Sequence, residues 1–409
     1  MSTPVAAGPL AGIKVLELGT LIAGPFCARM LAEFGAEVIK IEAPDGGDPI
    51  RQWRVLKDGT SLWWSVQARN KKSITLNMKN LRAQAIARTL ALEADIVIEN
   101  YRPGVLEKWQ LGYEDLKQHN PALIMVRLSG YGQTGPMKDL PGFGAIGESM
   151  GGLRFVTGHP DRPPLRVGIS IGDSVAALHG AMGAMMALRH RDATGGRWDG
   201  TQGGQGQMVD VALYEAVFNL MESLVPEYDH AGVVRERTGG GLPGIVPSNT
   251  YTTADGDNLV IAGNGDAIFK RLMLAIGRDD LANDAQLTRN DGRVPRTAEI
   301  DAAIQAWCST QTVDAALTTL QASDVPASKI YSVRDMFKDP QFLARQMFEQ
   351  HHFADGTPVK LPAITPKMSA TPGQTRWMGP ALGAHNQEVL QGLGYDALAI
   401  EQLKRDGVI

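Results

Sequence analysis

The chain has 409 residues, of which 44% are hydrophobic and 21% are charged, a composition typical of a globular protein with a normal core. Its net charge of −4 argues against nucleic acid or an anionic membrane as the main partner. The two cysteines have no metal-ligand spacing around them, so no metal site is expected and Cys27, in an apolar helical pattern, is expected to be a buried thiol. Because no secretory signal opens the chain and no apolar run reaches about 18 residues, we expect a cytoplasmic protein without a membrane partner.

The first third of the chain alternates short apolar runs with helical patterns. The pattern predicts strands at 13–18, 36–42, 73–78, 95–100 and 122–132, and helices at 26–35 and 80–93. Such alternation favours an α/β fold with a parallel sheet covered by helices on both faces. Ligands bind such sheets at the carboxyl ends of the strands, which directs attention to the loops that begin near Gly19, Asn100 and Ser129.

The middle of the chain changes character. Residues 192–207 are polar and rich in glycine, which predicts an exposed excursion, and residues 208–224 predict a strand that runs into a helix. Residues 249–263 predict a hairpin with its turn at 255–257, followed by helical patterns over 266–322 and a return strand within 322–333. We therefore expect a large domain from 1–228, a small α/β domain from 229–330, and a C-terminal part, 331–409, that returns to the large domain.

Asp173 is the most informative single residue. It lies in the run GISIGDS (168–174), immediately before a long pattern of Ala, Gly and Met that predicts a helix. A carboxylate at this point faces the exposed N–H groups of the first helical turn, which favour its ionised form, and an ionised carboxylate can act as a nucleophile. Aspartate is also a favoured N-cap, so the local sequence alone leaves both interpretations open.

Other motifs are weaker. The run VLELGTLIAGP (15–25) lacks G-x-G-x-x-G, so we do not predict a nicotinamide or flavin cofactor, although a helix N-terminus there can still receive an anion. Asn100 and Arg102 follow a buried strand. They either contact a ligand at the end of that strand or belong to a polar loop closed by the turn at Pro103 and Gly104. No G-x-S-x-G elbow occurs and the histidines are scattered, so neither a Ser–His–Asp triad nor a histidine metal site is expected.

Taken together and in order, these segments resemble one family. PLAGIKVLELGTLIAGP, GAEVIKIEAPDGGDPIR, NKKSITLNMKN, ADIVIENYRPGVLEKWQLGYEDL, RLSGYGQTGP, VGISIGDSVAALHG, GQMVDVALYEAV and LGAHNQEVLQGLGY are similar to the class III CoA-transferases, the family of formyl-CoA transferase and carnitine CoA-transferase. The resemblance implies a Rossmann-like large domain built from both chain ends, an inserted small domain, and an interlocked homodimer.

The resemblance also implies the site residues. The catalytic aspartate of the family falls on Asp173, and its mobile glycine loop falls on Gly239, Gly240 and Gly241. Some members carry Gln at the position of Ile22 and Arg at that of Ala43, so those polar contacts are missing here. The positions that contact CoA in the family fall on Ile22, Ala23, Leu76, Lys79, Asn100, Tyr101, Arg102, Lys108 and Tyr131.

The implied activity is transfer of CoA from an acyl-CoA, expected to be succinyl-CoA, to a carboxylic and dicarboxylate-like acceptor. It would run through an aspartyl anhydride and an aspartyl-CoA thioester, without a permanent cofactor. Arg166 and Arg237 either bind the distal carboxylate of a substrate or form surface salt bridges. Two alternatives remain: an α-methylacyl-CoA racemase, whose histidine is replaced here by Phe143, and a non-catalytic acyl-CoA-binding protein.

Overall fold

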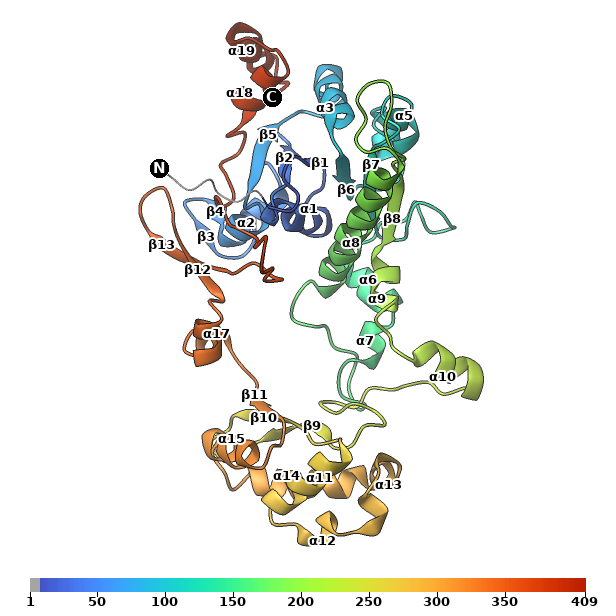
Figure 1. Ribbon diagram of the computed structural model, residues 1–409, viewed down its shortest axis with the longest axis vertical. Coiled ribbons are helices and arrows are strands. Elements are labelled where there is room, and N and C mark those ends of the chain that lie inside the picture. Colours follow the sequence, from blue (N-terminus) through green and yellow to red (C-terminus); the bar gives the residue numbers. More distant parts are fainter. Residues whose placement is uncertain (1–7) are drawn as a thin grey trace. The chain divides into compact units, whose positions relative to one another are not determined.

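The computed structural model describes residues 8–409, which form two compact units (Figure 1). Unit 1 comprises the chain up to Leu153, Val167–Glu222 and Met347–Ile409, and unit 2 comprises Arg154–Arg166 and Ser223–Gln346. The small unit is thus wider than the predicted 229–330, and it includes a segment that the sequence analysis left in the large domain. Packing explains this segment's place, because the Gly239 N–H donates to the Gly158 carbonyl at 2.9 Å.

Unit 1 is built on a six-stranded sheet in which every neighbouring pair is parallel, in the order β5-β2-β1-β6-β7-β8. The chain moves outward from β1 through β2 to β5, then returns to the other side of β1 and moves outward through β6, β7 and β8. This is the doubly wound order, with its reversal point between β1 and β6. The strands are β1 Lys14–Glu17, β2 Glu37–Glu42, β5 Lys71–Thr75, β6 Ile96–Glu99, β7 Ile124–Ser129 and β8 Met208–Ala212.

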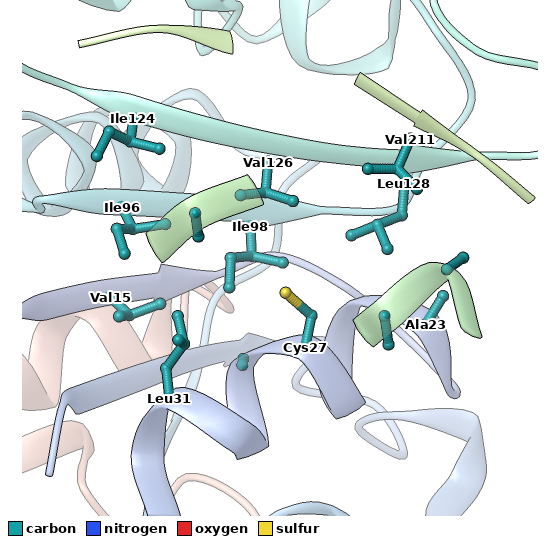
Figure 2. Packing of buried hydrophobic residues seen from close by; sticks show 14 of the residues in the cluster. Val15, Ala23, Cys27, Leu31, Ile96, Ile98, Ile124, Val126, Leu128 and Val211 are labelled. Carbon is teal, nitrogen blue, oxygen red and sulfur yellow. The ribbon is translucent and has the colours of Figure 1, made fainter. Parts of the chain in front are cut away.

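Alternate residues of these strands enter two separate cores, one on each face of the sheet. Val15 belongs to the first core and Leu16 to the second, and Ile96 and Val97 divide in the same way. Because both faces are covered, the strands read as continuous apolar runs rather than as alternating ones. Figure 2 shows the first core, where Cys27 lies against Ile98. The thiol is fully buried, which confirms the prediction, and burial raises its pKa to about 12.

Two helices cover the first face. They are α1 (Ala23–Glu33) and α8 (Ile171–Thr194), which pack on each other, and α8 runs along β7 and β8 (Figure 1). Helix α1 begins three residues before the predicted start at 26, because Pro25 fits the first turn, where its missing N–H costs no hydrogen bond. The other face packs on α3 (Leu81–Glu93), and its core includes residues of α18 (Asn386–Gly392) and α19 (Ala397–Arg405).

Helix α8 is long and apolar. By length and composition alone it is the one helix among the described residues that could cross a membrane, and the buried core helix of a globular protein meets the same criteria. Its buried positions, among them Ala176, Ala177, Gly180 and Ala184, face α1 and the sheet. Packing within unit 1 therefore explains the apolar residues on the buried side of this helix.

Shorter elements complete unit 1. They are the hairpins β3 (Leu56–Lys57) with β4 (Thr60–Ser61) and β12 (Phe348–His352) with β13 (Pro358–Pro362), and the helices α2 (Leu62–Gln67), α4 (Val105–Lys108), α5 (Tyr113–Lys117), α6 (Gly144–Met150), α7 (Leu153–Val156, at the boundary with unit 2) and α9 (Leu213–Phe218). Strand β8 followed by α9 confirms the predicted strand that runs into a helix.

Unit 2 is organised around a three-stranded antiparallel sheet in the order β11-β10-β9. The predicted hairpin is confirmed as β9 (Ser248–Thr252) and β10 (Asn258–Ala262), and the predicted return strand is β11 (Ala327–Lys329). The helices are α10 (Leu224–Ala231), α11 (Asp266–Ala275), α12 (Asp279–Ala282), α13 (Asn290–Arg293), α14 (Thr297–Cys308), α15 (Val313–Ala322), α16 (Val333–Met336) and α17 (Pro340–Ala344). Residues of α11, α14 and α15 join the sheet in one apolar core.

The glycine-rich excursion begins later than predicted, because α8 continues to Thr194. Its start is tied to the sheet by the buried Asp95, which accepts hydrogen bonds from Arg191 Nη1 at 2.7 Å and from the Lys14 backbone N–H at 2.8 Å. Arg191 also bonds the carboxylate of Asp192, which is exposed. The last turn of α8 is therefore held by one buried and one exposed carboxylate.

We predict that Asp95→Ala lowers the free energy of unfolding by about 3–5 kcal/mol, because it leaves the Arg191 guanidinium buried without its main partner. Asp192→Ala is the matched control and should cost less than about 1 kcal/mol, because the Asp192 carboxylate is exposed to solvent and Arg191 keeps its buried partner Asp95. Urea unfolding followed by circular dichroism measures both. Equal losses in the two variants would contradict the assignment of Asp95 as the anchor.

Candidate active site

A cavity opens at the reversal point of the sheet. The turn after β1, the loop after β6 and the loop after β7 line it, and these are the three loops to which the sequence analysis pointed. The start of α8 and residues before α6 close the remaining wall. Its lining residues are Thr20, Leu21, Ile22, Ala23, Asn100, Tyr101, Arg102, Pro103, Leu128, Ser129, Gly130, Lys138, Leu140, Gly142, Phe143, Asp173 and Leu213.

Asp173 lies in this cavity, on the first turn of α8. The N-cap of the helix is Ser170, and Asp173 is the third helical residue, so it is not the cap that the alternative interpretation required. The positive end of the helix favours the ionised carboxylate at this position. A half-buried carboxylate is therefore presented to a cavity from a rigid helix, which is the arrangement that a nucleophile needs.

Gly144, the first residue of α6, fixes where that carboxylate can lie. A Cβ atom on Gly144 would overlap the Asp173 side chain, with 2.6 Å to Cγ and a shorter approach to Oδ2. Gly172 likewise passes close to the Gly144 carbonyl oxygen, which would be 2.8 Å from an added Cβ. The first turns of α6 and α8 are thus packed backbone to backbone, and the carboxylate occupies the space that a side chain at 144 would take.

The predicted CoA-contacting residues divide between two neighbouring cavities. Ile22, Ala23, Asn100, Tyr101 and Arg102 line the cavity that contains Asp173. A second cavity shares Thr20 and Tyr101 with the first and is also lined by Leu76 and Lys79. Lys108, on α4, and Tyr131, in the loop after β7, lie outside the linings of both cavities.

Asn100 has a role that the sequence did not reveal. Its Oδ1 accepts a hydrogen bond from the Thr20 N–H at 2.7 Å, and its Nδ2 donates to the Thr20 carbonyl at 2.9 Å. Gly19 and Gly24 both approach this amide closely, and a Cβ on Gly19 would be 3.0 Å from Oδ1. Asn100 therefore joins the ends of β1 and β6 across the reversal point, and glycine at 19 and 24 leaves room for it.

The charges around the two cavities are of two kinds. Arg102 and Lys138 are exposed cations on the wall of the first cavity, and Lys79 is on the wall of the second. Asp48 also lines the second cavity; burial alone would raise the pKa of its carboxyl, but the Lys40 ammonium and two backbone N–H groups hold that pKa below its ordinary value. Burial raises the pKa of the Tyr101 hydroxyl to about 12, so this side chain stays neutral.

The remaining predicted residues belong to unit 2. Arg237 donates to the carbonyl oxygens of Phe155 at 2.8 Å and His159 at 3.3 Å, so it holds the segment 154–166 in place rather than forming a surface salt bridge. Gly239 has φ of 72° and packs against the His159 ring. The proximity of these residues to Asp173, like that of Arg166 and of Gly240 and Gly241, stays a prediction.

Several lining residues were missed by the sequence analysis. Lys138 and Leu140 come from the loop after β7, which was noted only for its tyrosine, and Gly144 had no distinguishing motif. Gly130 and Gly142 bring that loop back on itself, since a Cβ on either would meet the backbone of the other within 2.7 Å. The two glycines at the ends of this loop were the signal in the sequence that could have revealed its conformation. Their contact joins residues twelve positions apart, however, so the local pattern did not show it.

The comparisons with known proteins bear directly on this geometry. A family model described as CoA-transferase family III matches residues 10–386. The chain belongs to CoA-transferase family III. A succinyl-CoA–D-citramalate CoA-transferase of Chloroflexus aurantiacus is 49% identical over 99% of this chain and 100% of its own length. A succinate–glutarate CoA-transferase of Agrobacterium fabrum is 34% identical over 94% of this chain and 96% of its own length.

The solved structures agree with the family. A CAIB/BAIF family protein from Brucella suis matches 95% of this chain and 100% of its own with a TM-score of 0.81 at 32% identity. The predicted α/β fold and the predicted enzyme class, a class III CoA-transferase, are thereby confirmed. Within residues 8–409 no group of three or more His, Cys, Asp or Glu side chains has the arrangement of a metal site.

We predict that Gly144→Ala lowers kcat for acyl-CoA turnover by about 10²-fold, because the new methyl group displaces the Asp173 carboxylate by about an ångström. The fold should survive, since the contacted atoms end a flexible side chain. Gly392→Ala, where an added Cβ meets nothing within 4 Å, is the matched control and should keep wild-type kcat. Wild-type turnover in Gly144→Ala would show that the position of this carboxylate is not critical.

Proposed function

We propose that this protein transfers CoA from succinyl-CoA to a dicarboxylate-like acid, with Asp173 as the covalent nucleophile. The observation that carries the proposal is the place of Asp173, on the first turn of α8 and on the wall of the cavity at the sheet's reversal point. The relatives named for succinyl-CoA and citramalate and for succinate and glutarate support the donor and the class of acceptor. CoA and its thioester are substrates here, and no permanently bound cofactor takes part.

The chemistry follows from the carboxylate. An oxygen of Asp173 attacks the thioester carbonyl of succinyl-CoA, the C–S bond breaks, and CoA leaves as a thiolate from the mixed anhydride. The thiolate then attacks Cγ of Asp173, the anhydride C–O bond breaks, and succinate leaves. The product is an aspartyl-CoA thioester, and the acceptor carboxylate reverses the two steps onto itself. No step consumes an oxidant, a proton or ATP, because one thioester replaces another.

The lining residues suit this sequence. Leu128, Leu140, Phe143 and Leu213 give the cavity an apolar wall next to Asp173, which disfavours water near a hydrolysable anhydride. In our proposal Ile22, Ala23 and Asn100–Arg102 contact the thioester end of CoA, and Leu76 and Lys79 contact the end that lies in the second cavity. The glycine loop, Gly239–Gly241, is proposed to cover the reaction centre.

The acceptor needs a second anionic group in this proposal. Arg102 and Lys138 are the cations on the wall of the cavity that contains Asp173, and either can pair with a distal carboxylate. Arg166 remains a further candidate, while the guanidinium of Arg237 already bonds two backbone carbonyls. None of the described lining residues is a histidine, so the cavity lacks the base that the racemase alternative requires.

We also propose that the protein is a homodimer, and that its chains are interlocked. One face of α8 is apolar and exposed, with Leu178, Met182, Met185 and Met186 each between 42% and 62% exposed. The spacing of these residues puts them on one side of the helix. Apolar patches of this kind on a globular protein mark protein–protein contacts, and a second copy of the chain is the proposed occupant.

We expect Asp173→Ala to lose CoA exchange by a factor on the order of 10⁴ or more, because no other group replaces the nucleophile. Asp173→Asn should lose nearly as much, since the amide keeps the size of the side chain and lacks the charge. Exchange of labelled acid into acyl-CoA, measured by mass spectrometry, gives the rate. Wild-type turnover in either variant would reduce Asp173 to a structural residue.

A panel of donors and acceptors tests the substrate class. With succinyl-CoA as donor, four- and five-carbon dicarboxylates should accept CoA at least about tenfold better, by kcat/KM, than monocarboxylates of equal length, because only the dicarboxylates have a distal carboxylate that can pair with a cation on the cavity wall. Exchange limited to monocarboxylates would contradict the acceptor class. Loss of configuration at Cα without any exchange would instead support a racemase, and binding without turnover would support a carrier of acyl-CoA.

For the homodimer, Met182→Glu/Met186→Glu should prevent assembly, because two carboxylates would be buried in an apolar contact. Leu398→Glu, on α19 and 79% exposed in the structure, is the control and should assemble normally. Light scattering after gel filtration gives the mass. If the chains are interlocked, two differently labelled wild-type preparations should exchange no subunits until they are unfolded. A monomeric wild type would contradict the homodimer, and free subunit exchange would contradict the interlocking.

A further inference from the structure

Six charged side chains are packed together in unit 1 against residues 19–25, and the proposed chemistry makes no use of them. Residues 19–25 form the turn after β1 together with the first turn of α1, and we call them the β1–α1 turn. Each is at most 5% exposed. Three are carboxylates and three are cations, so their formal charges cancel. We call this set the buried charge cluster; it consists of Glu17, Lys40, Glu42, Asp48, Arg51 and Lys71.

Lys40, on β2, is the centre of the cluster. Its Nζ donates to Glu17 Oε1 at 2.7 Å and lies 2.9 Å from Asp48 Oδ2. The same ammonium also donates to the Gly19 carbonyl at 2.6 Å, which is the first residue of the β1–α1 turn. One buried cation therefore connects two carboxylates of the cluster to the backbone of the turn.

Asp48 holds the turn from the other side. Its two oxygens accept the Leu21 N–H at 3.0 and 3.2 Å, and Oδ1 also accepts the Ile50 N–H at 3.0 Å. Leu21 has φ of 65°, in the left-handed region that a leucine seldom adopts. Such a conformation persists only where the surroundings over-determine it, and the Asp48 carboxylate supplies that constraint.

A second lysine secures the far end of the turn. Lys71 Nζ, from β5, lies 2.7 Å from Glu17 Oε2 and donates to the Pro25 carbonyl at 2.7 Å. The cluster thus reaches the turn at three backbone groups, the Gly19 carbonyl, the Leu21 N–H and the Pro25 carbonyl. Between these points lie Thr20, Leu21, Ile22 and Ala23, which line the cavity that contains Asp173.

We infer that Lys40 and Asp48 are positioning residues for the transfer reaction: they hold the β1–α1 turn in a strained conformation that sets the thioester against Asp173. The inference rests on the proposed function. A purely stabilising role explains the arrangement less well, because buried ion pairs contribute little net stability compared with apolar residues of similar volume. What the charges supply is a fixed geometry for groups that must lie within a fraction of an ångström of their productive place.

The test is the double variant Lys40→Met/Asp48→Ala. It removes one cation and one carboxylate, so the cluster stays neutral, and it leaves the pairs Glu17–Lys71 and Glu42–Arg51, each at 2.7 Å. The matched control is Glu33→Gln/Arg69→Met, which removes a buried pair of unit 1 joined at 2.6 Å whose further partners include the Pro362 carbonyl, away from the turn.

Two readouts separate positioning from general stability. Hydrogen exchange followed by mass spectrometry should become at least about tenfold faster in peptides covering 18–27 in the test variant and stay unchanged there in the control. The kcat with saturating donor should fall at least about tenfold in the test variant, and stay within about twofold of wild type in the control. Thermal unfolding of both variants corrects for any difference in folded fraction.

Unchanged exchange at the turn overturns the inference, and so does faster exchange with a kcat equal to that of the control. If wild-type protein transfers no CoA between any donor and acceptor, the proposed function fails and the catalytic part of the inference falls with it. The exchange readout still decides whether the cluster positions the turn, because it needs no activity.

Discussion

The structure depends on the junction at the carboxyl ends of β1 and β6, where the sheet reverses direction. The connections that follow these two neighbouring parallel strands run in opposite directions. Their loops therefore diverge and open a space that no side chain of the sheet fills. Asn100 bridges that space by exchanging two hydrogen bonds with the backbone of Thr20. The cavity, the start of α1 and the placement of Asp173 all follow from this junction.

Around it, the protein places charge in two ways. Exposed cations such as Arg102 and Lys138 stand on the cavity wall, where an anionic substrate can meet them. Buried ions lie below, paired with one another and with backbone groups, and they hold the turn between β1 and α1. In our proposal the first kind recognises the substrate, and the second fixes the geometry of the turn.

Much of the fold could be predicted from the sequence, because the strands of a doubly covered sheet are short apolar runs between glycine-ended helices. The proposal that Asp173 is the nucleophile depends on the order of the whole set of motifs, since a lone aspartate before a helix more often caps it. The structure places it third in α8, with Ser170 as the cap.

What escaped prediction depends on contacts between distant residues. The sequence analysis assigned the segment 154–166 to the large domain, whereas the structure groups it with unit 2. Its place is set by hydrogen bonds to Arg237 and Gly239, some eighty residues later. The hydrogen bonds of Asn100 span 80 positions, and Lys40 meets Glu17 and Gly19 across the sheet. No motif marks Gly144, because its effect is to leave the space that the Asp173 carboxylate occupies.

The central claim is that the Asp173 carboxylate becomes transiently acylated and then carries CoA. Working enzyme supplied with succinyl-CoA can be trapped with hydroxylamine or borohydride, digested, and its peptides sequenced by mass spectrometry. The account predicts a hydroxamate or a reduced side chain at position 173, absent when the donor is left out. A modification confined to another residue, or none under turnover conditions, would contradict it.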